Sequence, residues 1–200
     1  MRLSLLLAAV SLVATTSLQA VPLLTISPSS QTVTAGSSTD VQVLVSGLAS
    51  GSAPSLGAYD LNFTFDPTIV AFTSLTFGDS MQGDQLDLSG TGSISDSAIQ
   101  SPGLLEFFEI SLDQASVLDS QQAGSFVLAT LHLQGLASGT TSLALSVNSL
   151  SDSSGAPLTA TADPGSITVT ATPEPGALWL FPLAGAWIAA RFRRSQQPRG

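Results

Sequence analysis

Between positions 21 and 170, hydrophobic and polar residues alternate in short stretches, which is the pattern of β-strands with one buried face. The clearest case is 58–65, where Tyr59, Leu61, Phe63 and Phe65 alternate with polar residues. Segments rich in Gly, Pro, Ser and Asp separate the stretches and indicate turns. The expected strands are 23–26 with 31–34, as two parts of one split strand, and then 40–46, 58–65, 70–77, 93–99, 104–112, 126–133, 141–147 and 166–170. The pattern predicts an all-β domain, an antiparallel sandwich or barrel of about nine strands.

Two parts of this region depart from the simple alternation. The first strand is interrupted by Pro28, which is typical of a strand that changes sheets or lies at an edge. Residues 78–100 are the least regular, so we expect a long surface loop with one short strand near its end. No helical periodicity of useful length is present.

The N-terminus carries the pattern of a secretory signal. Arg2 precedes an apolar run over 3–13, and about 11 residues is the length of a signal core rather than of a membrane span. We expect a signal peptide that is cleaved after Ala20 or, as the alternative, after Ser17. An uncleaved anchor would need a longer run.

The C-terminus combines a second apolar run, 176–190, with arginines that follow it. Because arginines beside a membrane span stay cytoplasmic, Arg191, Arg193 and Arg194 would set the topology of a single membrane-spanning helix. The expected organisation is a signal peptide over 1–20, a β-sandwich over 21–170, a linker over 171–175, an anchor with its Arg-rich end over 176–194, and a disordered tail over 195–200.

Charge supports export of the middle of the chain. The whole chain has five basic residues, which are Arg2 and four at or beyond Arg191. Thirteen of the 14 acidic residues lie in 21–170, so this region has a formal charge of about −13. Nucleic acid is excluded as a partner, because binding it requires Lys and Arg against the phosphates. The absence of cysteine excludes disulfides, Cys-ligated zinc and thiol nucleophiles.

The tail has three ordered parts: Pro173, Glu174 and Pro175, then the apolar run 176–190, then the Arg-rich end. In this order it resembles the PEP-CTERM sorting signal of exported bacterial proteins. The resemblance implies recognition by an exosortase, an integral membrane processing enzyme, during a transient stay in the inner membrane. The departures are a span shorter than about 20 residues, interrupted by Pro182. A plain C-terminal tail anchor is the alternative.

Three segments of the body form a further pattern: 32–45, with Thr32-Val-Thr-Ala-Gly36 and Val41-Gln-Val-Leu-Val45; 57–70, with a strand that ends at Asp66-Pro67; and 124–145. Together they resemble the cohesin family and related carbohydrate-binding-like sandwiches. The resemblance implies a nine-stranded sandwich of jelly-roll type. It also implies a protein-binding role, because cohesins bind dockerin modules on cell-surface scaffolds.

Candidate chemistry in the body is sparse. His132 is the only histidine; Phe126, Leu128 and Thr130 are expected on its face of the strand, and a structural or solvent-facing role is favoured. Glu106 and Glu109 are three apart in a strand and therefore point to opposite faces, which disfavours a paired acid and base. These observations predict a protein that is not an enzyme and uses no cofactor.

Three carboxylates in the irregular loop, Asp79, Asp84 and Asp87, are weak candidates for calcium ligands. Their spacing matches no established calcium loop, and a solvated acidic loop is the alternative. Asp66 before Pro67 predicts a turn that ends a strand, since Asp bonds its own downstream backbone.

The sequence therefore favours a non-enzymatic exported module for protein–protein adhesion at the cell envelope or in the extracellular matrix. Its partner would be a surface protein. Binding of exopolysaccharide is the alternative, although the only tyrosine of the body is Tyr59 and both tryptophans, Trp179 and Trp187, lie in the tail. Sugar binding by stacking needs exposed aromatic rings.

Overall fold

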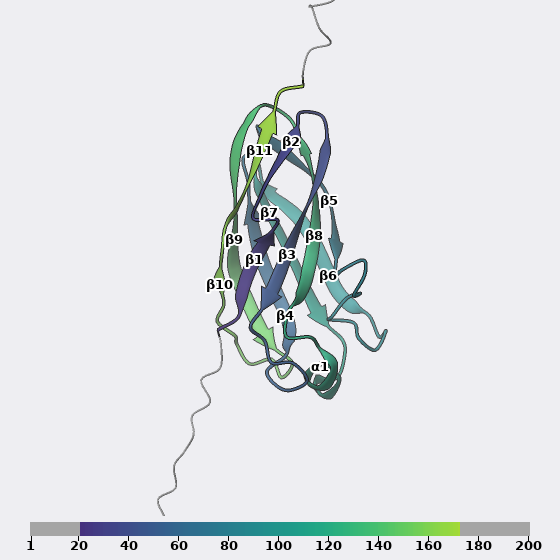
Figure 1. Cartoon of the computed structure of the whole chain (residues 1–200). Coiled ribbons are helices and arrows are strands. Elements are labelled where there is room, and N and C mark those ends of the chain that lie inside the picture. The colour runs from purple at the N-terminus through teal and green to yellow at the C-terminus, as the bar shows by residue number, and fades with distance from the viewer. Residues whose placement is uncertain (1–20, 173–200) are drawn as a thin grey trace, which may run out of the picture.

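The computed structural model describes residues 21–172, which form two β-sheets packed face to face (Figure 1). The all-β sandwich predicted from the alternating pattern is confirmed. One sheet has the order β10 (Thr161–Ala162), β1 (Leu23–Ser27), β3 (Ser38–Ser46), β8 (Phe126–Gly135) and β5 (Val70–Phe77). The other has the order β2 (Ser30–Thr34), β11 (Gly165–Thr170), β9 (Gly139–Asp152), β4 (Leu56–Thr64), β7 (Leu104–Ser111) and β6 (Ser93–Ser101).

The interrupted first strand is divided between the sheets, as predicted from Pro28: β1 joins the five-stranded sheet and β2 the six-stranded sheet. The expectation of about nine strands, all antiparallel, is wrong. The described chain has 11 strands, and β1 with β10 and β2 with β11 are parallel pairs. The two residues of β10 are too few to show an alternation. The direction of a neighbouring strand leaves no trace in the alternation of a strand's own side chains.

A short helix, α1 (Ala115–Gln121), lies at the end of the sandwich where β1 begins (Figure 1). It was not expected, because two turns are too short for a clear helical period. It is fixed by side-chain contacts: Leu118 is buried, and Asp119 accepts hydrogen bonds from the hydroxyls of Ser55 (2.6 Å) and Ser153 (2.8 Å). The buried Gln122 amide then bonds the backbone N–H and C=O of Leu56.

The core lies between the sheets and takes alternate residues from each strand. In β4, Tyr59, Leu61 and Phe63 have at most 1% of their surface exposed, as the alternation predicted. Tyr59 packs edge-on against Phe107 of β7, with ring centroids 6.0 Å apart. The residues between them in β4, including Asp60, point to solvent.

The prediction for the faces of β8 is wrong in its first half. Phe126 and Leu128 were expected to share the face of His132, yet both are buried together with Val127 and Ala129. The pairing with β3 shifts between Val43 and Leu44, so the strand is irregular there and the alternation restarts after it. From Ala129 onward the alternation holds.

Several predictions fall outside the described residues. They are the signal peptide, the sorting motif, the apolar run 176–190 and the arginines that follow it. Within 21–172, no helix has the length and apolar character needed to cross a membrane.

Candidate functional site

The outer surface of β4, β7 and β6 combines carboxylates with apolar side chains. Strand pairing places Phe108 between Asp60 and Asp96. Two residues further along β7, Ile110 lies opposite Ile94 of β6. Ile110 is 43% exposed and Ile94 is 53% exposed. We call this surface the acidic face, and its residues are Asp60, Ile94, Asp96, Ala98, Glu106, Phe108 and Ile110.

A small hollow of about 140 Å³ lies within the acidic face. The half-buried ring of Phe108 forms its apolar wall, and the carboxylates of Asp96 and Glu106 line it. Gln100 donates its amide to Glu106, and Asp96 accepts the backbone N–H of Ser97 at 2.8 Å. The two carboxylates are thus held in place beside an apolar surface, which suits a side chain with an aliphatic stem and a cationic end.

A chain of amides orders the neighbouring part of the face. Asn148 of β9 donates to Asp60 at 3.0 Å and accepts from Asn62 at 2.9 Å. These bonds link β4 to β9 through their side chains as well as their backbones. The acidic face is therefore a rigid sheet surface rather than a loop, which lowers the entropy that binding would cost.

Glu109 and Glu106 lie on opposite faces of β7, as predicted. Glu109 has no exposed surface, and its carboxyl accepts hydrogen bonds from the hydroxyls of Ser93 (2.6 Å) and Tyr59 (3.0 Å). Burial and a hydrogen bond with the neighbouring Asp84 carboxyl raise the pKa of Glu109 to about 8. The group is therefore protonated at neutral pH, and it holds the loop that carries Asp84 against the sheet.

The three calcium candidates are not brought together. Asp79 accepts the backbone N–H groups of Met81 and Gln82, Asp84 accepts that of Leu86, and Asp87 accepts that of Gly92. Within 21–172 there is no group of three or more His, Asp or Glu side chains that could hold a metal ion. Each carboxylate instead satisfies the backbone of its own loop.

Asp66 forms the predicted turn. Its Oδ1 accepts the backbone N–H of Thr68 at 2.8 Å and the Thr68 hydroxyl at 2.6 Å. These bonds lower the pKa of Asp66 below its ordinary value. The residue ends β4 and has a structural role.

His132 lies on the outer surface of the five-stranded sheet with 33% of its side chain exposed. Its Nδ1 is 2.7 Å from Asp40, and its Nε2 is 3.2 Å from the hydroxyl of Thr76. The histidine is partly exposed and hydrogen-bonded on both sides, within the structural or solvent-facing role expected of it, but the sequence did not indicate Asp40 or Thr76 as its partners. Both lie more than 50 positions away along the chain, so no local signal links them.

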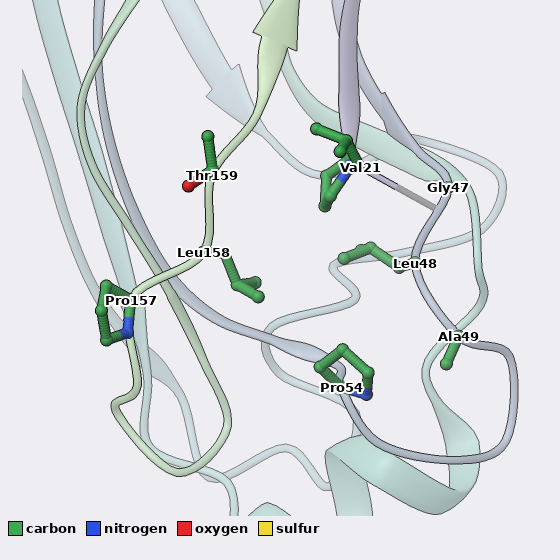
Figure 2. A pocket seen from close by; sticks show the side chains of 9 residues that line it. Val21, Gly47, Leu48, Ala49, Pro54, Pro157, Leu158 and Thr159 are labelled. Atoms are coloured by element: carbon green, nitrogen blue, oxygen red, sulfur yellow. The ribbon is translucent and has the colours of Figure 1, made fainter. Parts of the chain in front are cut away.

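An apolar pocket of about 390 Å³ lies at the end of the sandwich near the first described residue. Figure 2 shows Leu48, Pro54 and Leu158 around this pocket, with Val21 at its edge. It contains no titratable side chain, so its lining offers contact area rather than chemistry. Tyr59, the one tyrosine, is buried and offers no platform for a sugar ring.

A comparison with protein families matches the chain to the cohesin domain model over residues 24–169. No curated protein matches it. Solved structures with a similar fold include the cohesin of a type I cohesin–dockerin complex from Clostridium thermocellum (10% identity, 76% of this chain and 96% of that chain covered, TM-score 0.59).

Two further similar structures are a non-cellulosomal cohesin from Archaeoglobus fulgidus and the sixth cohesin of scaffoldin B from Acetivibrio cellulolyticus. The first has 14% identity, a TM-score of 0.55, and coverage of 76% of this chain and 92% of that chain. The second, solved with a Cel5 dockerin, has 18% identity, a TM-score of 0.57, and coverage of 75% and 99%. At these identities the likeness shows the fold.

Proposed function

The chain belongs to the cohesin domain family, and we propose that its β-sandwich is a non-enzymatic module that binds a partner protein through the acidic face. The family match supports a role in protein–protein adhesion. The structures from Clostridium thermocellum and Acetivibrio cellulolyticus are complexes with dockerins, which supports a protein as the kind of partner. The observation that carries the proposal is the exposed Ile94 and Ile110 beside the half-buried Phe108 on a rigid sheet.

The chemistry of the acidic face limits its partner. Asp60, Asp96 and Glu106 are its charged groups, and no Lys or Arg occurs between residues 3 and 190. A partner with an acidic surface would be repelled, whereas one that presents Lys or Arg among aliphatic residues would be attracted. We expect a partner Lys or Arg side chain to enter the hollow, with its stem on Phe108 and its charge between Asp96 and Glu106.

We further propose that the module is exported and sorted by the C-terminal signal. The signal peptide over 1–20 would start export, and Pro173, Glu174 and Pro175 would be recognised by an exosortase-type enzyme. The span 176–190 would hold the protein in the inner membrane until processing. The support is the ordered three-part tail and the confinement of Arg to the chain ends. The final location would be the cell envelope or the extracellular matrix.

A site-specific crosslinking experiment in the native host tests the proposed face. A photo-reactive amino acid at Ala98, which lies on the edge strand β6 opposite Glu106 in the acidic face, should capture a discrete protein. The same group at Thr168, on the outer surface of β11 in the same sheet, is the matched control and should capture none. Adding Asp96→Lys and Glu106→Lys to the Ala98 variant should abolish the product, because the charge of the face is then reversed.

Charge reversal could also act by unfolding the domain, so the melting temperature of the double variant is measured in parallel. Both carboxylates lie at the surface, and we expect it to change little. Equal capture from Ala98 and Thr168, or capture that survives the charge reversal, would contradict binding through the acidic face.

A further inference from the structure

Four hydroxyl and amide side chains form a row across the outer surface of the five-stranded sheet. Strand pairing places Ser27 of β1 opposite Gln42 of β3, Gln42 opposite Thr130 of β8, and Thr130 opposite Thr76 of β5. Because neighbouring strands are about 4.8 Å apart, the row extends over about 14 Å. We call these four residues the polar row. It offers a continuous line of hydrogen-bonding groups from four different strands.

The polar row lies in a pocket of about 420 Å³, which Asp40 and His132 also line. The imidazole is held from both sides, by Asp40 on Nδ1 and by Thr76 on Nε2. Its orientation is thereby fixed, and the ring forms a firm wall beside the row. The hydrogen bonds within the described residues leave the Gln42 amide and the Ser27 and Thr130 hydroxyls free for a ligand.

The lining excludes most classes of ligand. An anion would find no Lys or Arg, since 21–172 contains none. A metal ion would find no group of three ligating side chains in the same range. A lipid tail or an aromatic ring would find no large aliphatic side chain to pack against, because Pro28 is the only proline or aliphatic residue among the lining residues. A cation would find one carboxylate, Asp40, which is already engaged by His132.

A neutral ligand rich in hydroxyl groups remains. Amides and hydroxyls donate and accept hydrogen bonds at once, as sugar hydroxyls do. We infer that this pocket binds a neutral saccharide, with successive residues of the polar row contacting successive hydroxyl groups. This inference goes beyond the proposed protein binding and uses the other sheet of the sandwich. A protein on the acidic face and a polysaccharide on the polar row could thus be held by one domain.

Because His132 is the single histidine of the chain, its imidazole NMR signals report directly on ligand binding in this pocket. The full chain without a histidine tag, purified in detergent, is titrated with a neutral glucan hexasaccharide and a neutral galactan oligosaccharide while the imidazole NMR signals of His132 are followed. We expect a saturable shift with at least one of them at millimolar concentration. Thr130→Val, which removes one hydroxyl, and Gln42→Ala should each weaken binding about tenfold.

The matched control is Thr64→Val, a hydroxyl loss on the outer surface of the six-stranded sheet, which should leave saccharide binding unchanged. Asp96→Lys should also leave it unchanged, so failure of the protein-binding proposal is distinguishable from failure of this one. If the His132 NMR signals shift with an oligouronate or an oligolysine peptide and not with the neutral sugars, the inference is overturned. The absence of any shift up to tens of millimolar would overturn it as well.

Discussion

Glu109 lies in the core without exposed surface, and its carboxyl has three polar neighbours: Ser93, Tyr59 and Asp84. An ionised carboxylate at this position would be desolvated and would repel Asp84, which is why its pKa is raised. In the unfolded chain the same group would have its ordinary pKa of about 4.5. The folded state therefore binds one more proton than the unfolded state between these two values.

This difference predicts that the domain loses stability as pH rises from about 4.5 to about 8. The free energy of unfolding should fall by up to about 1.4 kcal/mol per pH unit in that window and level off above it. Glu109→Gln, which keeps the shape and removes the titration, should abolish the fall. Urea unfolding of both proteins at half-unit steps of pH measures the slope.

Three other carboxyls act in the opposite direction at lower pH. Hydrogen bonds lower the pKa values of Asp66, Asp113 and Asp152, so their contribution is lost as the solution is acidified below their ordinary pKa of 3.8. The wild-type chain should therefore be most stable near pH 4 to 5. A stability that is flat or rises between pH 5 and 8 would contradict the assignment of a protonated Glu109.

For single residues, the sequence predicted the face of the strand that a side chain occupies better than it predicted the residues that the side chain contacts. The period of two placed Glu106 and Glu109 on opposite faces correctly, because it depends on one strand alone. The approach of Asp84 to Glu109, and of Asp40 to His132, depends on how distant segments fold together. No spacing in the sequence encodes those contacts.

Among the strand connections, the turn from β6 to β7 controls the acidic face. Gly103 in this turn has φ of +80°, and a Cβ there would overlap the carbonyl oxygen of Phe65 and lie 2.9 Å from Cδ of Pro67. The Gly103 carbonyl also accepts the N–H of Phe65 at 3.0 Å. The turn is thus packed against the end of β4 and fixes the position of β6.

Gly103→Ala should therefore destabilise the domain by about 2–4 kcal/mol, from the left-handed backbone and the clash together. Gly36→Ala is the matched control, because its φ is +87° but nothing lies within 4 Å of the added Cβ. It should cost about 1 kcal/mol. Chemical denaturation of the two variants measures the difference, and equal costs would mean that the turn is free to move away from β4.

The sequence predicted the positions of ten of the strands, the first two as parts of one split strand, because each has enough residues for the alternation to show. It missed β10 and α1, which are short and are held by contacts from outside themselves. The buried Gln122 amide and Asp119, for example, bond α1 and its C-terminal end to Leu56, Ser55 and Ser153. Elements that form through tertiary contacts carry little local signal.

In the whole molecule, the described chain begins at one end of the sandwich and finishes at the other (Figure 1). The end of β11, which in sequence is close to the proposed sorting motif, is the same end that carries Gly36, as the hydrogen bond from the Ala35 N–H to the Thr170 carbonyl shows. If residues 176–190 anchor the protein in a membrane, the strands of both sheets extend away from that membrane. A partner on the acidic face or the polar row would then approach parallel to the membrane surface.

This arrangement requires that the arginines after the span keep it oriented. Replacing Arg191, Arg193 and Arg194 with Glu removes the positive charge that should stay cytoplasmic, so membrane retention and C-terminal processing should fall sharply. Arg199→Glu, outside the cluster, is the matched control and should be processed normally. A fused reporter that is active only outside the cytoplasm reports the position of the body, and immunoblotting reports its length and its membrane fraction.

The reporter and the immunoblot together would distinguish a defect in sorting from a defect in export. The body has a formal charge of about −13 and no basic residue to retain it, so the proposed signal peptide alone should still carry the triple variant outward. We therefore expect an active reporter together with unprocessed or released protein. Unchanged retention and processing of the triple variant would count against the sorting proposal, and an inactive reporter in the wild type would exclude an extracytoplasmic role for either binding surface.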